Sequence, residues 1–352
     1  MRVLVVAEQL ARAAPGGIGT YVRGLVAGLD GAAEVTLFGG RGLARVPDAA
    51  VIASPLPGAV LTRAWDRGAA VAPRGFDVVH GAALAAPPPQ NAPLVVAVHD
   101  LAWRVLPEAY PSRGRRWHEA ALRRAAARAA ALVTATPATA DALRRGGARR
   151  VEVLDPMYGC DHLPPPDGAA AEALLGRLGV AGPYLLTVGT REPRKNLPRL
   201  FEAYGRARPS LPEPWPLVVV GPAGWGRVLV GTGGPPLPPG VILAGEVPGA
   251  TLAALYAGAR CLVFVPLLEG FGLPAVEAMA AGAPVVASPM PSTADAAWAV
   301  DPLDIGAIAA ALVGAATDEA RRAELSAAGR ERARRLTWAA AAEAHLDLWK
   351  SL

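Results

Sequence analysis

The stretch CLVFVPLLEGFGLPAVEAMAAGAPVV (261–286) contains two apolar runs, separated by a glycine-containing loop and a segment of helical composition. Apolar runs without alternation indicate strands buried on both faces, which occur in parallel sheets covered by helices. Similar runs alternate with Ala/Leu/Arg-rich stretches over most of the chain, which predicts an α/β fold with doubly wound parallel sheets. The other runs are RVLVV (2–6), EVTLF (34–38), DVVH (77–80), LVVAV (94–98), ALVTA (131–135), PYLLTVG (183–189), LVVVG (217–221) and VILAG (241–245).

The chain's 352 residues suggest two domains, because a domain typically has about 100–200 residues. The alternation pauses where three consecutive prolines precede a short helical stretch, and we predict a linker at 166–182. The expected parts are an N-terminal Rossmann-like domain (1–165), a C-terminal Rossmann-like domain (183–335) and a C-terminal helix (336–352) that packs back across the domains. The two similar halves are expected to face a central cleft.

The composition excludes several classes of protein. With 52% apolar and 18% charged residues the chain is not intrinsically disordered, and no apolar run approaches the roughly 18–20 residues of a membrane span. MRVLVVAE at the N-terminus is predicted to be a strand rather than a signal peptide. Two cysteines without metal spacing fit a reducing, cytoplasmic location. The net charge of +5 comes almost wholly from arginine, without a base-stacking aromatic series, so no nucleic-acid partner is predicted.

A basic loop follows the apolar run PYLLTVG. In TREPRKNLPRLFEAY (190–204), Arg191, Arg194 and Lys195 precede Asn196, a predicted helix N-cap. A helix N-terminus favours a nearby anion by about 0.3–1 kcal/mol, and adjacent cations add to this, so the order predicts a diphosphate-binding loop. Lys195 is one of only two lysines, the other being Lys350. The alternative is a solvated loop with ordinary surface charges.

Two glutamates lie eight residues apart in the opening stretch. Glu269 follows a buried run, while Glu277 falls in the first turns of a helix that Pro274 is suited to begin. Gly270 and Gly272 allow a tight turn between them. Carboxylates accept hydrogen bonds from sugar and ribose hydroxyls, so both residues are candidate ligand contacts. The alternative is that Glu277 only complements the helix dipole and Glu269 is solvated.

The first half of the chain carries two weaker signals. Gly16, Gly17 and Gly19 precede a helix, but Val22 stands where a dinucleotide fingerprint has its third glycine or alanine. The alternative is a flexible loop. His99 follows LVVAV, at the end of a strand where active-site groups belong, and the alternative is a structural role, which is the more common one for a lone histidine at a strand end.

An arginine-rich segment, RGRRWHEAALRRAAARAAALV (113–133), has helical periodicity. Its apolar side contains Leu122, Ala125, Ala129 and Leu132. The helix predicted at 113–130 is a candidate for peripheral contact with an anionic membrane, and the alternative is a solvated face.

Together these motifs resemble the retaining glycosyltransferases of family 4, which have the GT-B architecture. The resemblance extends in order and spacing over nearly the whole chain, and its most specific part is Glu269-x7-Glu277 with EPRKN. The matching strings are APGGIGTYVRGL (14–25), DVVHG (77–81), VHDLAWRVLPEAYP (98–111), ATPATADAL (135–143), GCD (159–161), LLTVGTREPRKNLPRLFEAY (185–204), VVVGPAGWG (218–226), LAGEVPGATLAALYAGARCLVFVPLLEGFGLPAVEAMAAGAPVVAS (243–288) and DPLDIGAIAAAL (301–312).

The resemblance implies a role for each matched position. Arg194 and Lys195 would neutralise the leaving diphosphate, Glu277 would hold the ribose, and Glu269 would contact the donor sugar. His99 would line the donor sugar from the first domain, where the acceptor also binds. The remaining donor contacts implied by the resemblance are Gly17, Gly19, Gly245, Val247, Gly270, Phe271, Gly272 and Leu273. No metal and no cofactor besides the donor substrate are expected.

The predicted reaction is transfer of a hexose from a nucleotide diphosphate sugar, GDP-mannose or a UDP-sugar, to an acceptor hydroxyl with retention. Cations at the diphosphate stabilise the charge that develops as it leaves, and a phosphate oxygen takes the acceptor proton. The loop at 288–300 is shorter than in the family and lacks its Pro-Glu, and Thr190 replaces a basic residue. The alternatives are a nucleotide-sugar epimerase, a glycosidase, an NAD enzyme and a non-catalytic nucleotide-sugar-binding partner subunit.

Overall fold

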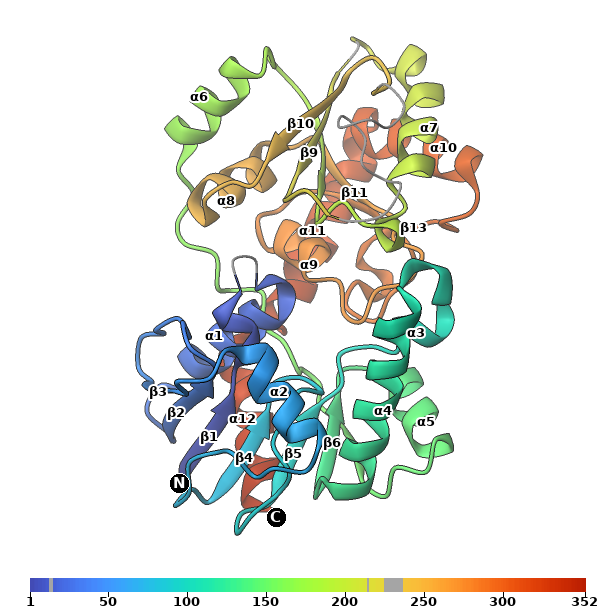
Figure 1. Cartoon of the computed structure of the whole chain (residues 1–352). Coiled ribbons are helices and arrows are strands. Elements are labelled where there is room, and N and C mark those ends of the chain that lie inside the picture. Colours follow the sequence, from blue (N-terminus) through green and yellow to red (C-terminus); the bar gives the residue numbers. More distant parts are fainter. Residues whose placement is uncertain (13–14, 214, 225–236) are drawn as a thin grey trace. The chain divides into compact units, whose positions relative to one another are not determined.

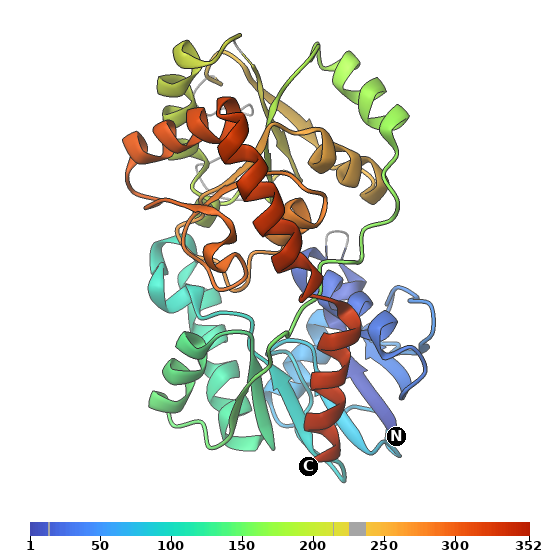
Figure 2. The same cartoon turned by 180° about the vertical axis from the view of Figure 1, so that it is seen from behind.

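Two parallel sheets organise the chain in the computed structural model (Figures 1 and 2). The structure describes residues 1–12, 15–213, 215–224 and 237–352. Ala14 of the glycine motif and Trp225 and Gly226 of VVVGPAGWG lie outside these ranges. The described residues form two units, Met1–Gly159 with Leu336–Leu352, and Cys160–Arg335.

The first unit is built on a seven-stranded sheet in the order β3-β2-β1-β4-β5-β6-β7. Figure 2 shows α12 along this sheet beside α1, and Figure 1 shows α2 and α4 across its other face. Its elements are β1 (Arg2–Val6), η1 (Glu8–Ala11), α1 (Gly16–Leu29), β2 (Glu34–Gly39), β3 (Ala50–Ala53), α2 (Gly58–Asp66), β4 (Val78–Gly81), β5 (Leu94–Ala97), α3 (Ala102–Val105), η2 (Pro107–Ala109), α4 (Ser112–Arg128), β6 (Ala131–Thr134), α5 (Pro137–Arg145), β7 (Val151–Val153) and α12 (Trp338–Lys350).

The second unit is built on a six-stranded sheet in the order β10-β9-β8-β11-β12-β13. α7 packs with α10, whereas α9 packs with α8 and α11. Its elements are α6 (Gly168–Arg177), β8 (Leu185–Val188), η3 (Pro193–Lys195), α7 (Leu197–Ala207), η4 (Arg208–Ser210), β9 (Leu217–Val220), β10 (Val241–Gly245), α8 (Gly249–Gly258), β11 (Cys261–Phe264), α9 (Leu273–Ala280), β12 (Val285–Ala287), η5 (Ala294–Ala296), β13 (Trp298–Ala299), α10 (Ile305–Thr317) and α11 (Glu319–Arg334).

Each apolar run predicted as a strand forms one, and every strand pairing is parallel. The runs are continuous because helices cover both faces of each sheet, so that Val3, Leu4 and Val5 of β1 are all fully buried. The strands β3, β7 and β13 were not predicted, and all three lie at sheet edges. β7 is interrupted by Glu152 and β13 has only two residues, whereas β3 is an apolar run, AVIA, that was not assigned to a strand.

The boundaries of the two units differ from those expected. The first division falls between Gly159 and Cys160, not at 165/166. The segment 166–182 is not a separate linker, because it contains α6, which packs on α8 within the second unit. The tail 336–352 is helical as expected, and it clusters with the first unit alone.

A cradle of glycines explains how the tail docks on the first unit. A Cβ atom at Gly24 or Gly28 of α1, or at Gly159, would collide with Trp338 at the start of α12. Gly24 and Gly28 are one helical turn apart and therefore present the same side of α1. The absence of side chains there lets the two helices approach closely enough to bury the indole ring.

Candidate functional site

The basic loop and the Glu269 loop meet because their strands are neighbours. β8 lies beside β11 in the second sheet, and both loops leave the carboxyl ends of these parallel strands. The backbone N–H of Leu267 donates a hydrogen bond to the carbonyl oxygen of Arg194 over 2.9 Å, so the loops are joined directly. Lys195 and Phe264 line a recess at the same edge. This is the place where open α/β sheets bind ligands.

The predicted catalytic residues of this unit form one ionic cluster. Lys195 Nζ lies 2.6 Å from Glu269 Oε2, and Arg194 Nη1 lies 3.0 Å from the same oxygen. Burial by itself raises the pKa of Glu269, but the two cations more than offset it, and the net pKa lies below its ordinary value. Glu269 is therefore a carboxylate with two cationic partners. The structure thus brings Arg194, Lys195 and Glu269 together.

Glu192 belongs to this cluster and was missed by the sequence analysis. Its carboxylate is buried, and its Oε1 accepts a hydrogen bond from Arg194 Nη2 over 2.7 Å. Arg194 Nη1 also donates to the carbonyl oxygen of Leu268 over 3.2 Å. The available signal was its place in the EPRKN string, two residues before Arg194. Because the pair is joined across the short 3-10 turn η3, no α-helical periodicity identifies it.

Asn196 is not the predicted side-chain cap. It stands just before α7 with a left-handed φ of 59°, and its side chain makes no capping hydrogen bond. Instead the amide donates to the carbonyl oxygens of Val265, at 3.0 Å, and Pro302, at 2.7 Å. The asparagine thus joins the basic loop to the end of β11. Tolerance of asparagine for the left-handed region makes this arrangement inexpensive.

The turn from Gly270 to Leu273 connects Glu269 to α9. Gly272 has a φ of 96°, and a Cβ atom there would collide with the sulfur of Met290. The positive φ and the close approach of Met290 both require glycine at position 272. Pro274 occupies the first turn of α9, as predicted. Phe271 is buried, so this turn offers ligands mainly its backbone.

Glu277 has two protein partners that the sequence did not predict. The hydroxyl of Tyr256 donates to Oε2 over 2.8 Å, and His162 Nε2 lies 3.2 Å from Oε1. Tyr256 is fully buried, and burial together with the neighbouring carboxylate raises the pKa of its phenol. A carboxylate oxygen accepts more than one hydrogen bond, so these contacts orient Glu277 and leave acceptor capacity for a ligand.

Gly245 is the last residue of β10, two strands away from β8, and Val247 follows it. Gly245 has a φ of 74°, and its carbonyl oxygen accepts a hydrogen bond from the N–H of Gly221 over 2.8 Å. A Cβ atom at Gly221 would collide with the backbone of Gly189. The carboxyl ends of β8, β9 and β10 therefore form a glycine-lined backbone surface. Arg191 is half-buried beside it, and its Nε has no hydrogen-bond partner within the described ranges.

His99 lies in the first unit, two residues beyond β5. Its Nε2 lies 2.7 Å from the carbonyl oxygen of Ala82, which only accepts, so Nε2 carries a proton. Burial lowers the pKa of His99, opposed by this carbonyl and by Asp100. In the neutral ring Nδ1 then accepts from the hydroxyl of Tyr158. Both ring nitrogens are thus engaged within the protein.

The glycines of the first unit lie inside a helix rather than before it. α1 begins at Gly16, so Gly17 and Gly19 stand in its first turn. Gly17 is exposed, whereas Gly19 is buried, and a Cβ atom there would collide with Pro15. The loop is shorter than predicted, because α1 begins directly after Pro15.

A buried polar chain lies behind α1. The hydroxyl of Tyr21 is 2.8 Å from Nε2 of His80 and 2.7 Å from Nε2 of His345. His345 Nδ1 must donate to the carbonyl oxygen of Ala341, 2.6 Å away, so Tyr21 donates to His345 and accepts from His80. Burial lowers the pKa of both histidines, to about 4 for His345. These three hydrogen-bonded side chains are therefore neutral, and they join β4, α1 and α12.

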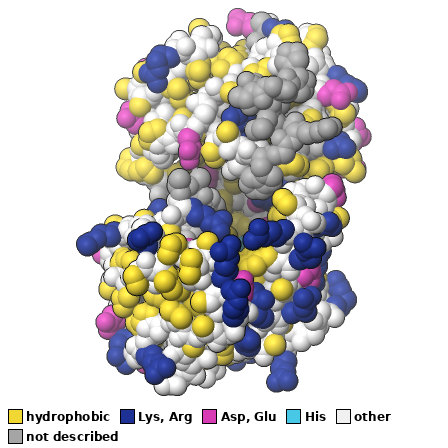
Figure 3. Space-filling view, viewed as in Figure 1, with side chains coloured by type: hydrophobic (Ala, Val, Ile, Leu, Met, Phe, Trp, Pro, Cys, Tyr) yellow, Lys and Arg dark blue, Asp and Glu magenta, His cyan; other side chains and the backbone are white. Residues whose placement is uncertain are grey.

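The arginine-rich helix ends earlier than expected. α4 stops at Arg128, Ala129 lies beyond it, and Leu132 belongs to β6, because the apolar run that follows joins the sheet. The side chains that α4 buries are Ala121, Leu122 and Ala125. Figure 3 shows arginine side chains gathered over α2 and α4. The exposed arginines of α4 are Arg113, Arg116, Arg123 and Arg128.

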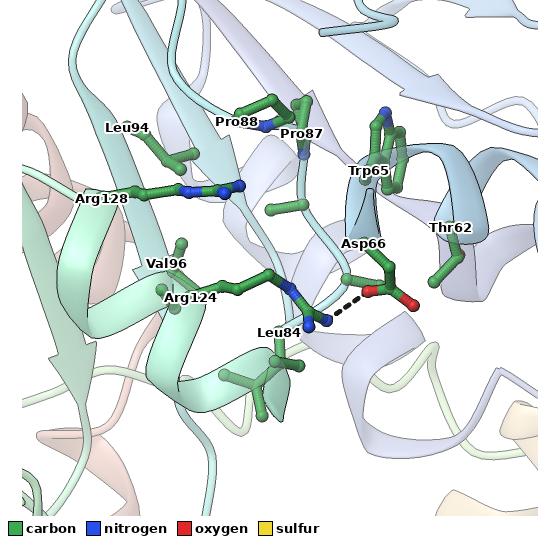
Figure 4. A pocket seen from close by; sticks show the side chains of 14 residues that line it. Thr62, Trp65, Asp66, Leu84, Pro87, Pro88, Leu94, Val96, Arg124 and Arg128 are labelled. Atoms are coloured by element: carbon green, nitrogen blue, oxygen red, sulfur yellow. Dashed lines mark hydrogen bonds and ion pairs between the residues drawn. The ribbon is translucent and has the colours of Figure 1, made fainter. Parts of the chain in front are cut away.

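A small pocket, partly open to solvent, lies between α2 and α4 (Figure 4). Arg124 forms an ion pair with Asp66 across it. Its lining includes Leu94, the first residue of β5, and Arg128, the last residue of α4. His99 follows the opposite end of β5. The pocket is therefore separate from the edge where a ligand of this sheet is expected.

Comparison with known proteins agrees with this geometry. Residues 15–157 match the model of "Glycosyltransferase Family 4", and residues 182–318 match that of "Glycosyl transferases group 1". Both halves of the chain therefore match glycosyltransferase models. The chain belongs to the family 4-like glycosyltransferases of the GT-B type.

Two curated relatives from Escherichia coli are mannosyltransferases. The O-antigen chain mannosyltransferase B is 35% identical over 165 residues, which are 44% of this glycosyltransferase and 42% of the relative. The serotype-specific mannosyltransferase WbdA is 32% identical over 176 residues, which are 47% and 21%. The chain thus spans less than half the length of the curated relatives it matches.

Solved structures share the fold over the whole chain. Sucrose-phosphate synthase from Thermosynechococcus elongatus has a TM-score of 0.75 at 23% identity, covering 100% of this glycosyltransferase and 98% of that chain. Anabaena HepE in complex with UDP and glucose has a TM-score of 0.72 at 18% identity, covering 100% of both. These similarities establish the GT-B fold.

The described residues contain neither a metal-ligand cluster nor a membrane-spanning helix. Across residues 1–12, 15–213, 215–224 and 237–352, no three His, Cys, Asp or Glu side chains are grouped as a metal site requires. In the same ranges no helix of this chain combines the length and hydropathy of a membrane span.

The short loop 288–300 contains η5 and β13. Ser288 Oγ donates a hydrogen bond to the carbonyl oxygen of Pro266 over 2.7 Å, which anchors the start of the loop.

Proposed function

We propose that this protein transfers a hexose from a nucleotide diphosphate sugar to an acceptor hydroxyl, with retention and without a metal ion. The observation that carries the proposal is the cluster of Arg194, Lys195 and Glu269 at the carboxyl ends of β8 and β11. Cations placed there suit a diphosphate, and a carboxylate beside them suits the hydroxyls of the attached sugar.

The proposed mechanism rests on stabilising the leaving diphosphate. Negative charge builds on the diphosphate as the anomeric carbon acquires oxocarbenium character, and Lys195 neutralises that charge. Glu269 binds hydroxyls of the donor sugar, and Glu277, oriented by Tyr256 and His162, binds the ribose. The acceptor attacks on the face that the diphosphate leaves, and a phosphate oxygen takes its proton.

His99 is proposed to line the donor sugar rather than transfer a proton. Both of its nitrogens are already engaged, with Ala82 and Tyr158, and burial favours the neutral ring. Its contribution would then be shape and the fixed direction of its ring. The exposed Gly17 in the first turn of α1 is proposed to approach the diphosphate through its backbone.

GDP-mannose is the donor to test first, because the curated relatives are mannosyltransferases. UDP-sugars come second, since HepE was solved with UDP-glucose. Each donor is incubated with candidate acceptors, with and without EDTA, and nucleoside diphosphate release and the anomeric configuration of the product are measured. The proposal predicts a retained linkage, unaffected by EDTA and dependent on Lys195.

Other outcomes would support the alternatives. An epimer or free sugar formed without an acceptor would indicate an epimerase. Binding of a nucleotide sugar without turnover, whatever the acceptor, would indicate a partner subunit. No binding of any nucleotide would overturn the proposal.

We also propose that the protein is cytoplasmic and that the exposed arginines of α4 place it peripherally on an anionic membrane. Four of them are exposed on one helix, which suits an anionic lipid surface. The test is sedimentation with vesicles of phosphatidylcholine alone or mixed with phosphatidylglycerol. Binding to the mixed vesicles only, lost when the four arginines are changed to glutamine, is expected. Equal binding to both vesicles, or to neither, would contradict this proposal.

A further inference from the structure

The ionic cluster of the second unit has balanced charge. Two cations, Arg194 and Lys195, lie beside two carboxylates, Glu192 and Glu269, and the side chains of all four are mostly buried. A balanced cluster presents little net attraction to an incoming anion, whereas a diphosphate adds at least two negative charges. The cluster must therefore rearrange if the proposed donor is to bind, and the following inference rests on that proposed function.

The two cations are held differently. The guanidinium of Arg194 donates to Glu192 and to the carbonyl oxygen of Leu268 besides its contact with Glu269. These two other partners would hold the Arg194 guanidinium in place without Glu269. Lys195 Nζ donates to Glu269 Oε2 at 2.6 Å and lies 4.8 Å from the ring centre of Phe264. An ammonium has three donors and no fixed planar geometry, so Lys195 can exchange one oxygen ligand for another.

The two glutamates of the Glu269-x7-Glu277 pattern are also held differently. Glu277 is bound by the neutral hydroxyl of Tyr256 and by His162. Its surroundings are therefore much less strongly charged than those of Glu269, which has two cationic partners. Of these two glutamates, only Glu269 accepts a hydrogen bond from Lys195, where a phosphate oxygen of the donor would bind. Its position is therefore that of a counter-ion.

We propose that Glu269 is the resident counter-ion of Lys195 and that diphosphate oxygens replace it on Nζ. The displaced carboxylate is then released to bind the hydroxyls of the attached sugar. A nucleoside diphosphate without a sugar also displaces Glu269 but offers it no hydroxyl, leaving an unpaired carboxylate beside the diphosphate. Glu269 thus weakens binding of the product relative to the donor, which favours product release.

The test is calorimetric titration of the full chain with GDP and UDP. Glu269→Gln keeps the shape and the acceptor oxygen but removes the negative charge, so the nucleoside diphosphate that binds the wild type is expected to bind at least fivefold more tightly. Glu277→Gln is the matched control: it makes the same charge change eight residues away, and it is expected to lower the affinity, because Glu277 is proposed to bind the ribose. Melting curves verify that each variant folds, and Glu269→Ala replaces Glu269→Gln if that variant does not.

Each outcome decides between the claims. Tighter binding in the Glu269 variant but not in the Glu277 variant supports the counter-ion role. If the wild type binds a nucleoside diphosphate and the Glu269 variant binds it equally or more weakly, the counter-ion role is wrong while the proposed function stands. If the wild type binds neither GDP nor UDP, the proposed function itself fails and takes the counter-ion role with it.

Discussion

The two units of the chain share a parallel-sheet architecture but place different polar chemistry inside it. In the first unit Tyr21, His80 and His345 form a buried chain in which every member is neutral. In the second unit the neighbouring ends of β8 and β11 hold an ionic cluster around Glu269. One arrangement ties helices to a sheet, and the other keeps exchangeable charges at the sheet's edge.

The difference separates stability from binding. Neutral hydrogen bonds inside the first unit contribute to its folding and leave nothing for an anion to displace. Ion pairs at the edge of the second unit contribute modestly to stability, because removing charges from water offsets their attraction. Changes in the first chain are therefore expected to affect unfolding, whereas changes in the ionic cluster are expected to affect ligand affinity.

The largest effect is expected from deleting residues 336–352. The deletion removes α12, including the buried Trp338, Trp349 and His345. Truncating one buried aromatic side chain costs about 3–5 kcal/mol, so losing the whole helix is expected to unfold the first unit. Calorimetry should then lack one unfolding transition. Deleting only 351–352 is the control and should change little, and unchanged melting of the long deletion would contradict the role assigned to α12.

Acid is expected to have the next largest effect. Because the pKa of His345 is lowered to about 4, the folded state holds the ring neutral while the unfolded chain takes up a proton below about pH 6.5. The contribution of His345 to the free energy of unfolding is therefore fully present above pH 6.5 and falls as the pH decreases toward 4. The loss from this residue is about 2 kcal/mol at pH 5. Denaturant unfolding of wild type and His345→Gln measures it. The variant should show a shallower pH slope, and parallel slopes would contradict a neutral His345.

Lys195→Ala is expected to weaken nucleoside diphosphate binding about tenfold, or about 1.4 kcal/mol, with little change in melting temperature. The variant removes the ammonium that Glu269 shares with the ligand. The chain's other lysine offers a control, because Lys350 is exposed at the end of α12 in the first unit. Calorimetric titration of Lys195→Ala and of the control Lys350→Ala measures the effect. Equal affinities for wild type and Lys195→Ala would place the diphosphate elsewhere.

The smallest expected effect concerns the ribose. Tyr256→Phe removes one hydrogen bond to Glu277, worth roughly 0.5–1.5 kcal/mol, and allows the carboxylate to turn. The preference for a nucleoside diphosphate over its 2′,3′-dideoxy form should fall by about threefold to tenfold. Tyr204→Phe removes a comparable buried hydroxyl that donates to the carbonyl oxygen of Trp215, and it should leave the preference intact. A preference equal in all three proteins would remove Glu277 from the ribose site.

The sequence predicted the central strands well, and the resemblance to family 4 implied that the two loops contact one donor. Fully buried parallel strands leave unbroken apolar runs, and parallel strands bring their following loops to one edge. The edge strands β7 and β13 escaped detection because they have only three and two residues, with Glu152 inside β7, and the short apolar run of β3 was not assigned to a strand. The family relationship depended on Glu269-x7-Glu277 with EPRKN rather than on periodicity.

The partners within each site were harder to predict. Glu192 joins Arg194 across a 3-10 turn, and Tyr256 reaches Glu277 from another helix, so no local spacing reveals either pair. His345 meets Tyr21 across 324 residues of sequence, because the tail returns to the first unit. The side-chain cap expected of Asn196 failed for a related reason: tertiary acceptors on Val265 and Pro302 attract its amide.

The central claim is that the second unit binds a diphosphate through its ionic cluster. Its most direct test is calorimetric titration of the wild-type chain with GDP and UDP, each compared with guanosine and uridine. We expect saturable binding of one nucleoside diphosphate, at least tenfold tighter than its nucleoside. Equal binding of the diphosphate and its nucleoside, or no binding of either diphosphate, would contradict it.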